Sequence, residues 1–307
     1  MKMNLTSTKV KEITERLKIE FLEKKDDSSE ISIFLCGGST KEQAKLRRNI
    51  GNELTGMSSK YTYTIHYPED MFMELIFGYK KHDLLSLENL LAKSVHVIVI
   101  ILQSPGTLVE LGAFANHSLL SDKLVVLIDS RHQRGKSFVN LGPVRYLKDK
   151  TKSHVSFTPL SHSNLKEIVK RVAELSRSVY RHSTRDITLE NPLASTEFYL
   201  SLVHTFEPLP RYSIPNIVSL LGASETVITS AESIINTLIN SGKISLKHGQ
   251  LSISNSGKDQ LLQSCTNYFE RRKKDRFLSN ERCNALNLTL RKRKETPIQF
   301  WESVVRV

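Results

Sequence analysis

The chain is poor in the residues that mark several large classes of protein. It has only three cysteines, Cys36, Cys265 and Cys283, among 307 residues. They are odd in number and far apart, so no disulfide framework or metal site is indicated, and a cytoplasmic location is expected. The first ten residues hold no apolar stretch of signal-peptide length. The longest apolar run, Val97 to Leu102, is too short to cross a membrane, so no membrane association is expected.

Acidic residues are too few to balance the basic ones. Lys and Arg number 44 against 32 Asp and Glu, which gives a formal net charge of +12 and a pI of about 9.5. The hydrophobic content of 39% is that of an ordinary globular protein, and the length allows two domains with their own cores. The basic excess indicates a polyanionic partner, most simply nucleic acid, although charge that serves solubility alone is the alternative.

Short apolar segments alternate with helical periodicity through the first 180 residues. Strands are predicted at 31–35, 61–67, 95–102, 123–128 and 154–157, and helices at 4–25, 41–54, 71–79, 84–93 and 165–179. The third strand is apolar throughout apart from His96, as a strand covered on both faces must be. This alternation predicts an α/β fold with a doubly wound, parallel, five-stranded sheet.

The stretch after the third strand combines helix-start signals with a carboxylate. Ser104 can cap the helix, Pro105 falls at its first position, and Gly106 permits close approach to the backbone. Thr107 adds a hydroxyl near the free amides, and Glu110 follows about one turn in. Open α/β sheets bind ligands beyond the carboxyl ends of their strands, where such a carboxylate can attack a carbon or stabilise a cation. An ordinary helix start is the alternative.

The segment Gly106-Thr-Leu-Val-Glu-Leu-Gly112 resembles the catalytic segment of nucleoside deoxyribosyltransferases. In that family the Glu attacks C1′ of the sugar and displaces the base, so the resemblance implies this nucleophilic role for Glu110. Ser104 stands where the family usually carries an Asp that holds the base, which favours a different leaving group or hydrolysis. The chain also resembles a subgroup, the deoxyribosyltransferase-like effectors of retron anti-phage systems, which carry a C-terminal winged helix.

This resemblance implies a substrate class and partners. It implies an N-glycosidase toxin that cleaves a nucleotide. NAD⁺ is favoured as the substrate because nicotinamide leaves as a neutral base without needing a protonating acid. The implied partners are the retron reverse transcriptase and its multicopy single-stranded DNA (msDNA), a branched RNA–DNA molecule. No cofactor is implied. An oligomer is expected, because a neighbouring subunit completes the pocket in the resembled family.

The first two strands end in further candidate pocket residues. The first strand is followed by a Gly pair that starts a helix, a turn that can cradle phosphate or ribose and that lines the nucleoside pocket in the resembled family. Glu69, after the second strand, can reach sugar hydroxyls or simply begin a helix. The residues expected to bind substrate are Cys36, Gly37, Gly38, Ser39, Glu69, Ser104, Pro105, Gly106 and Thr107. The basic loop 129–138 is interpreted as a cover of the pocket mouth or a phosphate contact, or else as a solvated loop.

A polar stretch at 184–195 separates this domain, residues 1–190, from a second at 191–265. Helices at 196–206, 214–221 and 225–240, a hairpin at 243–254 and a helix from 256 follow the order of a winged helix-turn-helix. The presumed recognition helix begins with acidic and hydroxyl residues, among them Glu225 and Glu232. Nucleic-acid contact is therefore expected from the hairpin and the tail more than from base reading by this helix.

The tail, residues 266–307, carries two clusters of positive charge. They comprise Arg271, Arg272, Lys273, Lys274, Arg291, Lys292, Arg293 and Lys294. Such clusters bind phosphate backbones in a salt-dependent and sequence-independent way, and a solvated helix face is the alternative.

Two rival functions stay open at this point. One is a phosphoribohydrolase of the lysine-decarboxylase-like group, which shares Gly-Thr-x-x-Glu but has a longer Gly-rich run that this chain lacks. The other is a DNA-binding regulator whose α/β domain senses a nucleotide without turnover. The acidic start of the presumed recognition helix argues against the second.

Overall fold

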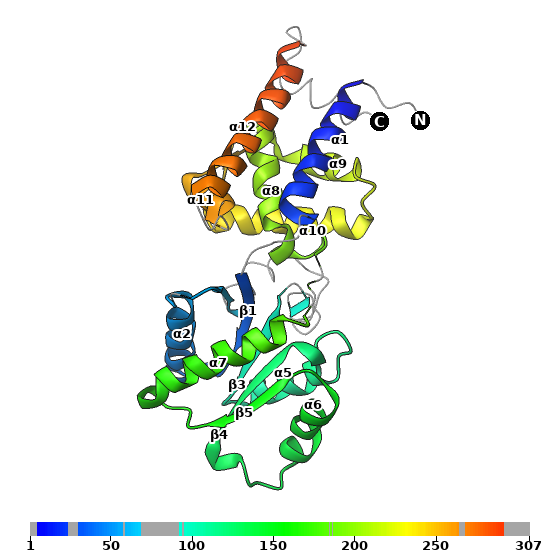
Figure 1. Ribbon diagram of the computed structural model, residues 1–307. Helices are drawn as coiled ribbons and strands as arrows, with labels where there is room; N and C mark the ends of the chain where they lie inside the picture. The colour runs from blue at the N-terminus through cyan, green and yellow to red at the C-terminus, as the bar shows by residue number, and fades with distance from the viewer. Residues whose placement is uncertain are drawn as a thin grey trace. The chain divides into compact units, whose positions relative to one another are not determined.

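The computed structural model describes residues 5–23, 30–57, 59–68, 92–93, 95–183, 185, 187–263 and 268–291. They form two compact units, labelled by element in Figure 1. One unit holds the described residues between 30 and 185, and the other holds those before 25 and after 186.

The first unit is built on a five-stranded sheet in the order β2-β1-β3-β4-β5. The strands are β1 (Glu30–Cys36), β2 (Thr62–His66), β3 (Val97–Leu102), β4 (Leu124–Asp129) and β5 (His154–Thr158). All four neighbouring pairs are parallel, with Ile33 opposite Val97 and Ile98 opposite Leu124. The predicted α/β class and its five-stranded parallel sheet are therefore confirmed.

Helices cover both faces of this sheet (Figure 1). Alternate strand residues such as Ile33 and Val99 share an apolar core with Leu46 of α2 (Lys41–Thr55) and Val172 of α7 (Leu165–Tyr180). Right-handed crossovers place α5 (Pro105–Ala115), which follows β3 toward β4, on the opposite face. The remaining helical segments of this unit are η2 (Ser121–Lys123), η3 (Ser130–His132), η4 (Asn140–Val144), α6 (Arg145–Lys150) and η5 (His162–Asn164).

The second unit is mainly helical around a separate core. Its elements are α1 (Leu5–Lys18), η1 (Ile19–Glu23), α8 (Pro192–Phe206), β6 (Leu209–Pro210), η6 (Arg211–Ser213), α9 (Ile214–Ser219), α10 (Glu225–Asn240), β7 (Ile244–Lys247), β8 (Gln250–Ile253), α11 (Asn255–Gln263) and α12 (Tyr268–Arg291). The strands form a small sheet in the order β6-β8-β7. Tyr199 and Phe198 of α8 are fully buried at the centre of this core.

The chain ends differ from the expected domain boundaries. The helix predicted at 4–25 forms, but its apolar face, including Val10 and Leu17, lies in the core of the helical unit and not with the sheet. Amphipathic periodicity reveals a buried face without naming the core that buries it. The expected tail is likewise part of the fold up to Arg291, because Leu278 and Ala285 of α12 enter the same core.

The helix predicted at 71–79 lies outside the described residues, as do residues 84–91 of the helix predicted at 84–93. Within the part of the chain that is described, no helix has the length and hydropathy needed to cross a membrane.

Candidate functional site

The carboxyl ends of β1 and β3 form a topological switch point. The chain leaves β1 toward β2 but leaves β3 toward β4, so α2 and α5 diverge to opposite faces. Open α/β sheets bind ligands in the crevice that such a divergence creates. One hydrogen bond joins its two sides: Nε2 of Gln43, on α2, donates to the backbone oxygen of Gln103, which follows β3, at 2.9 Å.

The predicted turn after β1 is held in place by side chains of α2. Gly38 is buried beneath the Gln43 carboxamide, and a Cβ at position 38 would force that carboxamide to move. Arg47, only 5% exposed, donates from Nη1 to the Gly37 oxygen at 3.3 Å. Cys36 is completely buried, whereas Ser39 is exposed. Ser39 is thus open to a ligand, but the Cys36 thiol and the buried Gly38 are not.

The start of α5 is a self-contained capping box. Ser104 accepts from the Thr107 amide, and the Thr107 hydroxyl accepts from the amides of Gln103 and Ser104 at 3.1 and 3.0 Å. That hydroxyl also donates to the Ser104 oxygen at 2.8 Å, and Thr107 is 1% exposed. Thr107 therefore shapes the turn from within, where sequence reasoning expected it to face a ligand. Pro105 and Gly106 are exposed.

Glu110 is the sixth residue of α5 and lies in its second turn. The side chain is half-buried and its Oε2 is completely buried. The influence of a helix dipole falls off within the first turn, so the dipole of α5 stabilises the Glu110 carboxylate only weakly. Two residues are separated by about 200° around a helix, which puts Glu110 and Leu108 on opposite flanks of α5.

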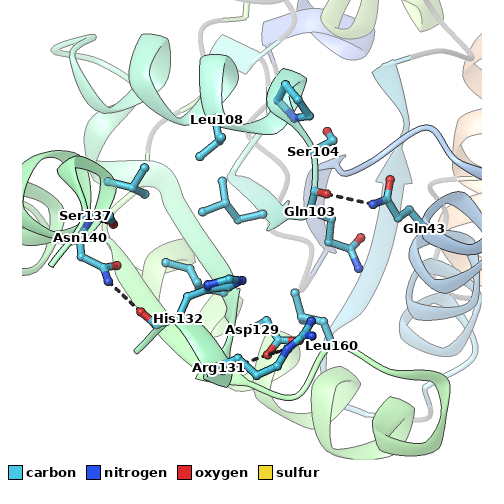
Figure 2. A pocket seen from close by; sticks show the side chains of 14 residues that line it. Gln43, Gln103, Ser104, Leu108, Asp129, Arg131, His132, Ser137, Asn140 and Leu160 are labelled. Carbon is cyan, nitrogen blue, oxygen red and sulfur yellow. Dashed lines mark hydrogen bonds and ion pairs between the residues drawn. The ribbon is translucent and has the colours of Figure 1, made fainter. Parts of the chain in front are cut away.

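A cavity of about 490 Å³ opens on the Leu108 flank (Figure 2). Gln43 and Gln103 lie along one side, Ser137 and Asn140 lie along the other, and Asp129 and His132 lie near the end opposite Ser104. The lining residues are Gln43, Leu102, Gln103, Ser104, Pro105, Leu108, Ile128, Asp129, Arg131, His132, Ser137, Val139, Asn140 and Leu160. The volume is in the range of small-molecule sites. Of the predicted site residues, Ser104 and Pro105 line this cavity and Glu110 does not.

The loop after β4, interpreted from sequence as a pocket cover, supplies the polar end of the cavity. Arg131 donates to Asp129 from Nε at 3.0 Å and from Nη2 at 3.2 Å, and its amide donates at 2.9 Å. The side-chain and backbone hydrogen bonds from Arg131 lower the pKa of Asp129 to about 2. Asn140 fixes the loop by donating to the oxygens of His132 and Gly135 at 2.8 and 2.7 Å. Asp129 is therefore a permanent anion whose charge Arg131 neutralises.

The remaining predicted site residues are Glu69 and the basic residues of the predicted tail, and the structure describes only some of them. Glu69 and Lys292–Lys294 lie outside the described residues, and only the backbone of Arg291 is described. Arg271, Arg272 and Lys273 are exposed on α12. Lys274 is engaged: its Nζ donates to Glu197 at 3.1 Å and lies 4.9 Å from the Phe21 ring centroid. Among the described residues, no group of three potential metal ligands occurs.

Sequence reasoning missed Gln43, Gln103 and Leu108. A signal was present for Gln103, since it is the first polar residue after a charge-free strand and therefore lies at the sheet edge. Gln43 is the third residue of a helix that follows a Gly pair, a place from which a side chain can reach back over the turn. Leu108 carried no signal, because an apolar residue in a helix is expected to be buried.

The chain was compared with known proteins. The family model described as "STM3845 retron effector protein" matches residues 43–246. The "Retron Ec86 putative ribosyltransferase/DNA-binding protein" of Escherichia coli is 30% identical over 229 residues, 70% of this chain and 73% of the relative. The "Retron Ec73 putative ribosyltransferase/DNA-binding protein" of Escherichia coli is 30% identical over 132 residues, 41% of this chain and 40% of the relative. Gln43, Gln103 and Glu110 of the switch-point site lie within the matched range, and the chain belongs to the STM3845 retron effector protein family.

Proposed function

We propose that this retron effector cleaves the N-glycosidic bond of a nucleotide through Glu110. NAD⁺ is the favoured substrate. The α/β unit resembles the nucleoside deoxyribosyltransferases in its Gly106–Gly112 segment, and two relatives carry the name putative ribosyltransferase/DNA-binding protein. In this proposal the enzyme is a toxin held in a complex with the retron reverse transcriptase and msDNA.

The observation that carries the proposal is the position of Glu110. Its helix begins at the switch point, where a hydrogen bond joins Gln43 of α2 to Gln103, and one of its carboxylate oxygens is withdrawn from water. Glu110 does not line the cavity on the Leu108 flank, but a carboxylate on a helix that starts at such a crevice can attack a sugar carbon. The exposed backbone of Gly106 and the exposed Ser39 offer polar contacts to a ribose.

The proposed reaction has two balanced steps. A Glu110 oxygen forms a bond to C1′ while the C1′–N bond breaks and its electron pair stays on the nitrogen. For NAD⁺ this makes the positively charged pyridinium neutral, so no proton donor is needed. Water then attacks C1′ of the glycosyl ester, the carboxylate leaves, and one proton is released to solvent.

The test is base release by full-length protein from a panel of nucleosides, nucleotides and NAD⁺, followed by chromatography. Wild type should release a base, and Glu110→Gln should lose at least about 10³-fold in kcat because an amide is not a nucleophile. The matched control is Glu167→Gln, an exposed carboxylate in the first turn of α7, which should keep wild-type activity. Base release by Glu110→Gln at the wild-type rate would refute the assignment.

The helical unit is proposed to be a winged helix-turn-helix that contacts nucleic acid through its hairpin and α12. The order α8, α9, α10, β7, β8 supports this reading. Exposed residues at the start of α10 include Glu225, Thr226, Thr229 and Glu232, which carry no positive charge. Lys247 and His248 at the hairpin tip and the exposed cations of α12 are better suited to phosphates.

A further inference from the structure

The outer face of α7 carries a row of cations that the proposed reaction does not use. This α7 row consists of Lys166, Lys170, Arg177 and Arg181. Arg181 is the C-cap and keeps helical backbone angles, with φ −61° and ψ −20°. Since each residue turns a helix by about 100° and advances it by about 1.5 Å, the four residues fall within about 60° of one another over about 22 Å. Three of the side chains are exposed, and that of Arg177 is half-buried.

The stability of the helix does not explain this row. Like charges four residues apart destabilise a helix, and each end of the row contains one such pair. Lys166 lies in the first turn, where the helix dipole disfavours a cation. Both features cost helix stability, which indicates that the charge serves binding.

Exposed cations elsewhere in the sheet unit find acidic partners. Arg145 of α6 pairs with Asp149 at 3.5 Å. Glu174 could reach the row from its position on α7, but it pairs with Arg171 at 3.7 Å. Among the described residues, no carboxylate forms an ion pair with a cation of the row. Its positive charge is therefore available to an anionic partner.

We propose that the α7 row binds the phosphate backbone of a single strand of nucleic acid. The two cations at each end of the row are about 6 Å apart along the helix axis, which is close to the step between successive phosphates of an extended strand. The row is straight, so a flexible strand can follow it, whereas each backbone of a duplex winds away from a straight line. Contacts from lysine and arginine to phosphate carry no sequence information, so this binding is sequence-independent and depends on salt.

This inference goes beyond the proposed function, which assigns nucleic acid to the hairpin and α12. It places a second contact on the α/β unit, and it does not depend on cleavage at Glu110.

The test is fluorescence anisotropy of a labelled oligothymidylate titrated with full-length protein at several salt concentrations. The row variant combines Lys166→Gln, Lys170→Gln and Arg181→Gln, all at exposed positions outside the core. The slope of log K against log[salt] should fall by about 2, near 0.7 for each lost contact with a single strand. The conservative variant Lys166→Arg, Lys170→Arg and Arg181→Lys should keep the parent slope, because it keeps every charge.

The matched control removes three exposed cations from the other side of the unit, through Lys148→Gln, Lys150→Gln and Lys152→Gln. These residues lie on α6 or just after it, and a right-handed crossover from β4 to β5 places α6 on the face opposite α7. The control has the same net charge as the row variant and should keep the parent slope.

The slope should fall by the same amount whether or not α12 carries the triple replacement Arg271→Ala, Arg272→Ala and Lys273→Ala. Failure at α7 and failure at α12 therefore give different results. Oligouridylate is the second ligand, and a lower slope with either strand supports the proposal. An equal fall in the row variant and the control would overturn it. An unchanged slope with both strands would also overturn it and would leave an acidic protein surface as the better occupant of the row.

Discussion

At the residue scale, His96 takes the place of a backbone group beside β1. Its amide donates to the Ser32 oxygen at 3.0 Å, and its Nδ1 accepts from the Ser32 amide at 3.0 Å. The ring also lies against Tyr180, with 4.7 Å between centroids. Burial, together with the charges of Arg185 and Lys123, lowers the pKa of His96 to about 3. A proton on Nδ1 would also place two N–H groups face to face, so the neutral ring is part of the sheet.

This arrangement predicts an acid-dependent loss of stability. The unfolded pKa is about 6.5, so the neutral ring stabilises the fold fully above that pH, and this contribution falls as the pH drops from about 6.5 toward 3. The slope due to His96 alone is at most about 1.4 kcal/mol per pH unit. Urea unfolding at pH 7, 6 and 5 should therefore show a steeper decline for wild type than for His96→Gln, which cannot titrate. Parallel declines would contradict the assignment.

The Gly-Thr-x-x-Glu segment shows how far residue types reveal a site. Ser104 and Pro105 were correctly placed at the helix start, because capping is a local property of the backbone. The Thr107 hydroxyl was expected to contact a ligand, but it accepts hydrogen bonds from two backbone amides of the turn instead. A hydroxyl beside free backbone amides accepts their hydrogen bonds whether or not a ligand binds. Only the structure therefore distinguishes a hydroxyl that caps the helix from one that binds a ligand. The cavity on the Leu108 flank depends on a loop after β4, and sequence spacing did not reveal that contact.

At the element scale, the segments with one clear signal were predicted within about two residues. β1, β3 and β4 are runs of apolar residues, and α2 and α7 have a periodic buried face with distinct ends. The sequence pattern did not predict β6 or α12, and the reason differs between the two elements. β6 is only two residues long, and α12 has ten charged residues among its 24 and apolar side chains only at intervals. Both are specified by the tertiary contacts that bury Leu209 and Leu278.

Helix α12 carries two kinds of cation. Arg271, Arg272 and Lys273 are exposed and available to nucleic acid, whereas Lys274 forms an ion pair within the fold. Replacing Arg271, Arg272 and Lys273 together by Ala should weaken binding of a branched RNA–DNA ligand and lower the salt dependence of log K by about 2, near 0.7 per single-strand contact. Lys274→Ala should leave that slope unchanged and lower the free energy of unfolding instead, because it breaks the contact with Glu197. Fluorescence anisotropy from 50 to 200 mM salt measures the slope. An unchanged slope in the triple variant would rule out α12 as the contact.

At the scale of the whole molecule, the described segments before residue 25 and after residue 186 both belong to the helical unit, and the strands of the large sheet lie between them in the sequence. An ion pair joins α1 to α12. Arg16 of α1 donates to both carboxylate oxygens of Glu281 of α12, at 2.9 and 2.8 Å. Glu281 is 5% exposed, and the hydrogen bond with Glu281 raises the pKa of Arg16. The first turns of the chain are therefore structural parts of its last domain.

Removing the arginine should destabilise this unit. Arg16→Met leaves the Glu281 carboxylate buried without its cation, but because the Arg16 side chain is 43% exposed, the cost is reduced to about 1–2 kcal/mol. Lys11→Met removes a weaker exposed pair with Glu15, at 3.7 Å, and should cost less than about 0.5 kcal/mol. Urea denaturation compares the two variants. Equal midpoints would show that the Arg16 pair adds nothing.

The insertion also sets an order of events during synthesis. All five strands of the sheet, from β1 to β5, emerge before α12, and Glu281 follows Arg16 by 265 positions. At about 5–20 residues per second, α1 waits roughly 13 to 53 seconds for α12. During that interval Val10, Ile13, Leu17 and Phe21 have no α12 to cover them, and α8 emerges only in its later part. If the ribosome stalls after β5, the nascent chain would have a folded α/β unit preceded by an N-terminal helix with an exposed apolar face. Such an intermediate is prone to chaperone binding or to aggregation.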